Sequence, residues 1–303
     1  MDKNKKIKVL YFAGSGRSGS TILNIILGNH PQIFGGGELQ NMCEVYNATK
    51  ICSCQAPLIN CKFWSSVMND WLSKVDDDNI DSGLKKWGNV EGVFSLKSWL
   101  KMYFGIGQKS KEFKEYLNST TEFYRSLQYH SNKEIVVDIS KNPLRAWALE
   151  KNPNIDLRMV HLVRDGRAVA WSLKKNAKEQ NRKRPTWRAA MFWVVINRLT
   201  NLVRSKVQHK IVVRYEDFIE NPGIILKQIG LMSEVDFSSI INKIESNDDF
   251  VIEHVMAGNA IRKANTIKFQ TSNSEGWKNK LRPGSKSLFK TLSFSSLKKF
   301  NYQ

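Results

Sequence analysis

The sequence predicts an α/β fold in three layers, with a central, mainly parallel sheet between helices. Apolar runs alternate with helical patterns along the chain, which is typical of this class. The runs are rich in β-branched residues and have no polar face, as strands covered on both sides require. With 303 residues and 41% apolar content, the chain can enclose a large core. We therefore expect a single domain over residues 1–303.

The strands and helices follow from these runs in chain order. Four main strands are expected at Ile7–Ala13, Glu134–Ile139, Leu157–Val163 and Lys210–Tyr215, with a shorter one at Gln32–Phe34. Helices are expected at Ser20–Leu27, Arg167–Lys175, Thr186–Arg204 and Pro222–Ile229. In the long third helix, Trp187 and Trp193 are expected in the core.

Two regions depart from this alternation. Residues 43–130 hold four tryptophans among polar, weakly patterned sequence. They are interpreted as an inserted helical subdomain, which in an α/β enzyme commonly supplies contacts to a substrate. Residues 248–303 have little periodicity and many Lys, Asn and Ser, and we expect a tail that covers a ligand.

The formal net charge is +19, from 47 Lys and Arg against 28 Asp and Glu. This excess favours a polyanionic partner, although a solvated Lys-rich surface would give the same count. No stretch approaches the roughly 20 apolar residues of a membrane span, which leaves only contact with a membrane surface open. The start, Met1–Lys6, runs into a strand without the apolar region of a signal peptide. We expect a cytoplasmic protein, and the oligomeric state is left open.

A glycine-rich loop, Gly14–Thr21, connects the first strand to the first helix. Glycines let the backbone approach an anion, and a helix N-terminus points unpaired N–H groups at it. The spacing of Gly14 and Gly19 is that of the nucleotide-triphosphatase loop, but Ser20 stands where that loop has lysine. Positive charge comes instead from Arg17, whose planar guanidinium can grip a phosphate or sulfate group with two hydrogen bonds.

The run Gly16–Thr21 resembles the 5′-phosphosulfate loop of sulfotransferases that use 3′-phosphoadenosine-5′-phosphosulfate (PAPS). It is most similar to the carbohydrate and tyrosylprotein branch and its bacterial relatives. The resemblance implies a P-loop-like fold and transfer of a sulfuryl group from PAPS to a hydroxyl. The loop residues that it implies for the donor are Ser15, Gly16, Arg17, Ser18, Gly19, Ser20 and Thr21.

A second element follows the strand that ends at Val163. Arg164 stands at the strand end and Ser172 eight residues later. This spacing resembles the element with which the same family binds the 3′-phosphate of PAPS. The chemistry suits a dianionic phosphate, which needs a bidentate cation and a hydroxyl donor.

Two further residues are candidates for the chemistry, together with Arg17. Glu38 follows Gly35–Gly37 and lies 21 residues beyond Arg17, which resembles the tyrosylprotein sulfotransferases, where a Gly-Glu element supplies the general base. Lys141 also ends a strand and resembles the family's Lys-Asp-Pro element, with Asn142 in place of the acidic residue. It would stabilise charge on the leaving phosphate or the sulfuryl oxygens. No metal is expected to be required.

Several other residues are left with open roles. His161 alternates within a buried strand and is interpreted as a packed, hydrogen-bonded residue. His254 is interpreted first as a structural residue as well. It leads into Gly258–Asn259 and Arg262–Lys263, which resemble a late nucleotide-contact segment of bacterial carbohydrate sulfotransferases. Trp277, within the run 275–279, resembles the family's terminal Trp-Lys-Asn element.

The four cysteines, Cys43, Cys52, Cys54 and Cys61, fall within 19 residues. A disulfide would be unusual in a reducing cytoplasm. The spacing lacks the paired Cys-x2-Cys knuckles of structural zinc sites, so reduced, buried thiols are favoured over zinc.

Two other functions remain at this point. A small-molecule kinase of the P-loop class would need ATP and magnesium, and the missing loop lysine counts against it. A basic nucleic-acid-binding protein would explain the charge, but the sequence has no helix-turn-helix, zinc knuckle or RNP signature, so no nucleic-acid partner is expected. For a sulfotransferase, the resemblance favours a carbohydrate or glycolipid hydroxyl as acceptor.

Overall fold

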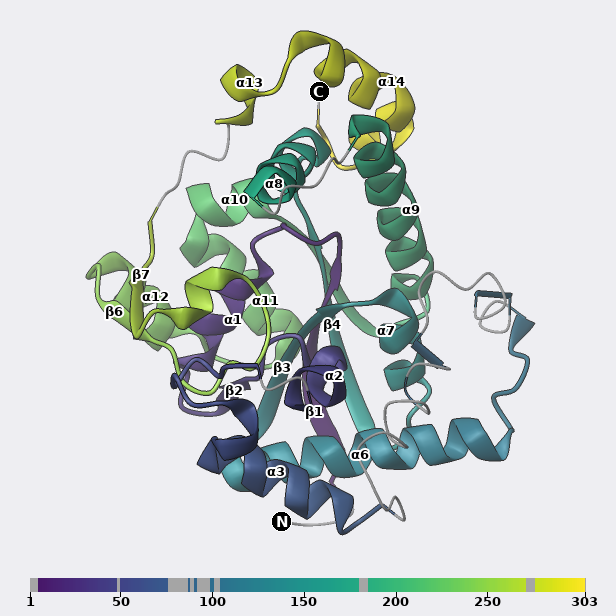
Figure 1. Cartoon of the computed structure of the whole chain (residues 1–303), viewed down its shortest axis with the longest axis vertical. Coiled ribbons are helices and arrows are strands. Elements are labelled where there is room, and N and C mark those ends of the chain that lie inside the picture. Colours follow the sequence, from purple (N-terminus) through teal and green to yellow (C-terminus); the bar gives the residue numbers. More distant parts are fainter. Residues whose placement is uncertain are drawn as a thin grey trace.

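A computed structural model describes residues 5–47, 50–75, 87, 90–91, 99–100, 104–179, 185–270 and 276–302, apart from the side chains of residues 43, 47, 178 and 179. The expected α/β fold is present, with a central sheet between helices (Figure 1). Among the described residues, none of the helices combines the length and the apolar character that crossing a membrane requires.

The central sheet has five strands, all parallel, in the order β2-β3-β1-β4-β5. The strands are β1 (Ile7–Gly14), β2 (Ile33–Gly35), β3 (Ile135–Lys141), β4 (Ile155–Val163) and β5 (His209–Arg214). All five lie where the sequence predicts them, with their ends shifted by one or two residues. Because the strands are parallel, their carboxyl ends meet at one edge, where ligands bind in open α/β sheets.

The side chains of β1 alternate between two cores. Val9, Tyr11 and Ala13 enter one buried cluster, and Leu10 and Phe12 enter the other. This is the period of two that a strand covered on both faces requires. The helices on the Leu10 face are α1 (Ser20–Gly28), α10 (Tyr215–Glu220), α11 (Pro222–Ser233) and α12 (Ser238–Glu245).

The opposite face is covered largely by the predicted insertion. Its described elements are helical: α2 (Met42–Asn47), the short turn η2 (Leu58–Asn60), α3 (Lys62–Leu72) and α6 (Lys111–Ser131). They pack with α7 (Pro143–Glu150) into the core that holds Val9 and Tyr11, so the described part of the insertion shares the core of the sheet. Figure 1 shows α6 running across the sheet at the end where the chain begins.

The tail is more regular than its composition indicates. β6 (Asp249–Val251) pairs with β7 (Thr266–Lys268) in an antiparallel ribbon, and α13 (Trp277–Lys280) precedes α14 (Pro283–Lys299). α14 packs with α8 (Gly166–Glu179) and α9 (Thr186–Arg204) in a third core, on the far side of the molecule from α6 (Figure 1). The helical period is hidden because serines occupy buried positions of α14: Ser293 is 1% exposed and donates to the carbonyl of Phe289 at 2.6 Å.

The tryptophans of α9 divide between core and surface. Trp193 is fully buried, as predicted, but Trp187 is 49% exposed in the first turn. The prediction for Trp187 was wrong, because its ring lies outside the buried positions of α9. There the ring of Trp187 packs under the guanidinium of Arg188, at 5.2 Å.

Candidate active site

The glycine-rich loop joins β1 to α1 at the carboxyl edge of the sheet. Gly14 and Gly19 have φ angles of 137° and 87°, which favour glycine. A Cβ on Gly14 would lie 2.3 Å from the carbonyl oxygen of Leu162, and one on Gly19 would lie 2.3 Å from the ring of Tyr215. Both glycines are therefore needed for conformation and for space.

The N-terminus of α1 is left open to an anion. Its N-cap, Gly19, offers no side-chain hydrogen bond, and the first turn holds no acidic residue. The loop keeps its own hydroxyls in place: Ser18 Oγ donates to the carbonyl of Ser15 at 2.8 Å and lies 2.9 Å from Ser15 Oγ. Free N–H groups and the helix dipole at this end suit a phosphate or sulfate group.

The second predicted phosphate element meets this loop. Arg17 Nε donates to Ser172 Oγ at 2.9 Å, although the two residues are 155 positions apart. Arg164 Nη1 donates to the carbonyl of Arg17 at 3.1 Å, and its guanidinium lies 4.4 Å from the ring centroid of Tyr215. A serine hydroxyl that accepts from a guanidinium keeps its own proton for another acceptor. Two cations and a donor hydroxyl thus converge at one place.

Arg164 also has donor capacity to spare. In the described part of the chain, its Nε atom is buried and has no hydrogen-bond partner. Buried donors are paired in most proteins, and an exception calls for a functional explanation. An anion bound against Arg164 and Ser172 would satisfy it.

The two remaining candidates form an ion pair. Lys141 Nζ lies 2.6 Å from Glu38 Oε1 and also donates to the carbonyl of Ile139 at 2.9 Å. Asn41 donates to the other carboxylate oxygen, Glu38 Oε2, at 3.1 Å. The charged side chains are a quarter exposed or less. A carboxylate and an ammonium are therefore held together at the ends of β2 and β3.

Two of the predicted cations have a left-handed backbone conformation. Arg17 and Lys141 have φ angles of 69° and 65°, and neither is a glycine nor caps a helix C-terminus. The pairing of β3 with β1 shifts register just before Lys141. Left-handed backbone costs of the order of 1–3 kcal/mol per residue and is retained at sites where geometry matters.

A buried charged network fixes the loop that carries Lys141. Arg145, which is fully buried, forms ion pairs with Asp138, at 2.9 Å, and with Glu91. Tyr124 donates to Asp138 Oδ2 at 2.6 Å, and burial raises the pKa of Glu91. Asp138 Oδ1 in turn accepts the backbone N–H of Ser140 at 2.9 Å. The strand end before Lys141 is therefore held by charge-assisted hydrogen bonds.

Asn24 fixes the turn before Glu38, and this role was not predicted from the sequence. Its amide donates to the carbonyl of Gly35 at 3.2 Å and accepts the N–H of Gly37 at 3.1 Å. It is fully buried on α1, so the donor loop's helix is tied directly to the turn before Glu38. The available signal was one amide within the apolar run 22–27.

Part of the tail reaches this site. The backbone N–H of Asn259 donates to Thr21 Oγ1 at 3.2 Å, and Ala257 accepts the N–H of Glu38 at 3.2 Å. Trp277 packs with Ala168 of α8, while the guanidinium of Arg167 lies 4.6 Å from its ring. Glu275, the start of the run that contains Trp277, lies outside the described residues.

His161 and Arg262 have structural surroundings. His161 Nε2 lies 3.0 Å from Asn197 Oδ1, and burial lowers the pKa of this histidine to about 4, so it is neutral at physiological pH. Arg262, which is 8% exposed, donates to the carbonyls of Ile51 and Val255 at 2.9 and 3.2 Å. The expectation that His161 is a packed, hydrogen-bonded residue is confirmed.

Comparison of the whole structure with solved structures identifies the fold. A sulfotransferase domain from the Synechococcus PCC 7002 olefin synthase matches with a TM-score of 0.52 and 17% identity, over 97% of both chains. A sulfotransferase domain from the curacin biosynthetic pathway matches with a TM-score of 0.54 and 16% identity, over 100% of this chain and 99% of the other. The chain has the sulfotransferase fold.

This sulfotransferase fold is shared along almost the whole length. A sulfotransferase from Mycobacterium avium also matches, with a TM-score of 0.51 and 11% identity, over 99% of this chain and 78% of the other. No family model and no curated protein matches the sequence.

Proposed function

We propose that the protein is a sulfotransferase that moves a sulfuryl group from PAPS to a hydroxyl, by in-line displacement. One observation carries the proposal: the two predicted phosphate elements converge, with Arg17 Nε 2.9 Å from Ser172 Oγ and Arg164 bonded to the Arg17 carbonyl. PAPS has a 5′-phosphosulfate and a separate 3′-phosphate. ATP, with a single triphosphate chain, would leave the second element without a partner.

The residues divide between donor and chemistry. Ser15–Thr21 would hold the phosphosulfate against the N-terminus of α1, and Arg164 with Ser172 would hold the 3′-phosphate. Arg17 and Lys141 would stabilise negative charge on the sulfuryl oxygens and on the leaving phosphate. No step of this reaction calls for a metal ion.

The reaction balances with one proton acceptor. The hydroxyl oxygen of the acceptor attacks sulfur and forms the new O–S bond, while its proton passes to the Glu38 carboxylate. The bond between sulfur and the bridging oxygen breaks, and its electron pair leaves with adenosine 3′,5′-bisphosphate. Lys141, whose Nζ is 2.6 Å from Glu38 Oε1, would shift from the carboxylate to that bridging oxygen.

The acceptor is proposed to be a carbohydrate or glycolipid hydroxyl, because the loop Gly16–Thr21 resembles that of the carbohydrate and tyrosylprotein sulfotransferases. The described elements of the segment 43–130 cover one face of the sheet, and the segment would supply acceptor contacts. The tail from 248 would cover the donor through Gly258 and Asn259, near Thr21. Contact with a membrane surface, a cytoplasmic location and the absence of a nucleic-acid partner belong to the same proposal.

A ligand comparison tests the proposal. Adenosine 3′,5′-bisphosphate should raise the melting temperature, whereas ATP with Mg²⁺ and single-stranded DNA should not. Labelled PAPS, incubated with a panel of sugar, glycolipid, tyrosine and small-alcohol acceptors, should then identify the product. Stabilisation by ATP with Mg²⁺ but not by the bisphosphate would reject the sulfotransferase function in favour of a kinase.

A further inference from the structure

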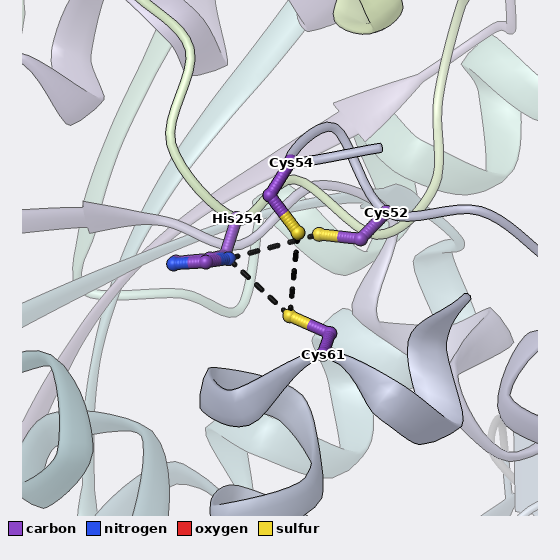
Figure 2. A group of neighbouring side chains, drawn as sticks. All are labelled: Cys52, Cys54, Cys61 and His254. Carbon is purple, nitrogen blue, oxygen red and sulfur yellow. Dashed lines mark hydrogen bonds between the residues drawn. The ribbon is translucent and has the colours of Figure 1, made fainter. Parts of the chain in front are cut away.

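Three cysteines and one histidine that are not among the residues proposed to bind the donor come together in a group. The three sulfur atoms of Cys52, Cys54 and Cys61 and Nδ1 of His254 all lie within 4.8 Å of one another. Figure 2 shows the four side chains pointing toward a common centre, with the other ring nitrogen of His254 directed away. The three cysteines are free thiols. Sequence spacing alone did not reveal the group, because His254 is 193 positions beyond Cys61.

Three of the six distances between ligand atoms are close to those of a tetrahedral site. With Zn–S bonds of about 2.3 Å and a Zn–N bond of about 2.0–2.1 Å, neighbouring ligand atoms of a tetrahedron lie about 3.5–3.8 Å apart. Cys54 Sγ and Cys61 Sγ are 3.6 Å apart, and His254 Nδ1 lies 3.3 Å from Cys61 Sγ and 3.8 Å from Cys52 Sγ. A disulfide would require two sulfur atoms at about 2.05 Å.

The chain holds these ligands in position by other contacts. Cys52 and Cys54 lie on a tight turn, in which Cys52 N donates to Ala56 O at 2.9 Å and Gln55 takes a left-handed φ of 68°. Cys61 is the N-cap of α3. The ring of His254 stacks on Phe63, with centroids 5.0 Å apart and planes 9° apart. The ligands therefore come preoriented on three separate pieces of chain.

A positive charge lies next to the four ligands. The Arg262 guanidinium, bonded to the carbonyl of Ile51, lies beside the cysteine turn. Three thiolates and a neutral imidazole around Zn²⁺ carry one net negative charge, which a neighbouring cation compensates.

We propose that Cys52, Cys54, Cys61 and His254 bind one structural Zn²⁺ ion. Four protein ligands fill the tetrahedron and leave no position for substrate, so the metal is structural. It joins the start of the helical insertion to the segment that follows β6. Three residues beyond His254, Ala257 accepts the N–H of Glu38, and Asn259 contacts Thr21, so the metal braces the segment that closes on the proposed donor site. The metal site does not depend on the proposed sulfuryl transfer.

Metal analysis of the whole chain tests the site directly. The protein, expressed with zinc in the medium and purified without chelator, should contain about one zinc per chain by mass spectrometry. Replacement by Co²⁺ should give the intense visible bands of a tetrahedral ion and a near-ultraviolet thiolate charge-transfer band. Cys54→Ser is the first variant to use, because the exposed Cys54 side chain is the least needed for packing. It should lose most of the zinc while keeping a native circular dichroism spectrum.

Matched variants distinguish the loss of a zinc ligand from a loss of folding. His254→Ala should lose zinc, whereas His254→Cys, which supplies a fourth thiolate, should retain it. Cys43→Ser, at the cysteine whose side chain lies outside the described residues, and His209→Gln should both keep about one zinc per chain. Native protein without zinc or cobalt binding would overturn the proposal, as would a Cys54–Cys61 disulfide in a non-reduced digest. Neither result bears on PAPS binding, which is measured separately.

Discussion

Lys141 Nζ lies 2.6 Å from Glu38 Oε1, and this pair joins the ends of two neighbouring parallel strands. Contacts of the preceding residues fix each partner. Asn24 is hydrogen-bonded to the turn before Glu38, and the Arg145–Asp138 ion pair holds the end of the strand before Lys141. The proposed base and the proposed leaving-group cation are thus set in position by the fold before any ligand binds.

Glu38→Gln tests the base. The amide keeps the size of the carboxylate but cannot accept a proton, so turnover should fall by about 10²- to 10⁴-fold. Binding of adenosine 3′,5′-bisphosphate, measured by calorimetry, should change little. Glu245→Gln, at an exposed position of α12, is the matched control and should keep wild-type turnover. Near-normal turnover in the Glu38 variant would remove this residue as the base.

Lys141→Met tests the cation at the transferred group. Removing one preoriented charge near the developing negative charge should lower turnover by about 10²- to 10³-fold. The affinity for the unreacted donor should change less, because the lysine is paired with Glu38 before reaction. Steady-state kinetics with labelled PAPS separates the two effects. An unchanged kcat with a raised KM would show that Lys141 only helps to bind the donor.

Arg145→Met tests the buried network behind Lys141. The variant leaves Asp138 and Glu91 buried without their cation, which should lower the free energy of unfolding by about 3–5 kcal/mol. Urea unfolding measures this loss. Adding Asp138→Asn and Glu91→Gln to the same chain should restore part of the stability, since no uncompensated charge is left. Equal stability of the single and triple variants would contradict the assignment.

His161 should make stability fall at acidic pH. Burial lowers its pKa from 6.5 to about 4 in the folded chain, so between these values the unfolded chain binds a proton that the folded chain does not. Stability is unaffected above pH 6.5 and is lost as the pH falls, by about 3 kcal/mol at pH 4. Urea midpoints for His161→Gln should therefore fall less steeply with pH than those of the wild type. His209→Gln, on β5, should keep the wild-type slope. If His161→Gln and the wild type have equal slopes, burial of His161 is not the cause of the loss of stability at acidic pH.

The sheet and the donor loop could be predicted from the sequence because each depends on continuous stretches of the chain. Short continuous apolar runs rich in β-branched residues define the main strands, and the loop from Gly14 to Thr21 is a continuous motif. Glu38 and Lys141 were recognisable as candidates because each directly follows or ends a strand. Their pairing could not be predicted from spacing, since it depends on β2 and β3 being neighbours in the sheet.

Residues that act across long separations were missed for the same physical reason. The roles of Asn24 and Arg145 depend on tertiary hydrogen bonds, and a polar residue in a helix carries no sign of its partner. His254 completes a group whose other members lie almost 200 positions earlier, so the cysteine spacing alone looked unlike a metal site. In α14, buried serines concealed a helix whose apolar residues are few.

Arg164 and Ser172 are proposed to form the site for the 3′-phosphate of PAPS. Calorimetric titration with adenosine 3′,5′-bisphosphate and with adenosine 5′-monophosphate tests it most directly, because the ligands differ only in that phosphate. Charge-assisted hydrogen bonds from Arg164 and Ser172 predict that the wild type prefers the bisphosphate by about 100-fold. Arg164→Ala should lose most of this preference while binding the monophosphate as before. Equal affinity of the wild type for the two nucleotides would show that Arg164 and Ser172 do not bind the 3′-phosphate.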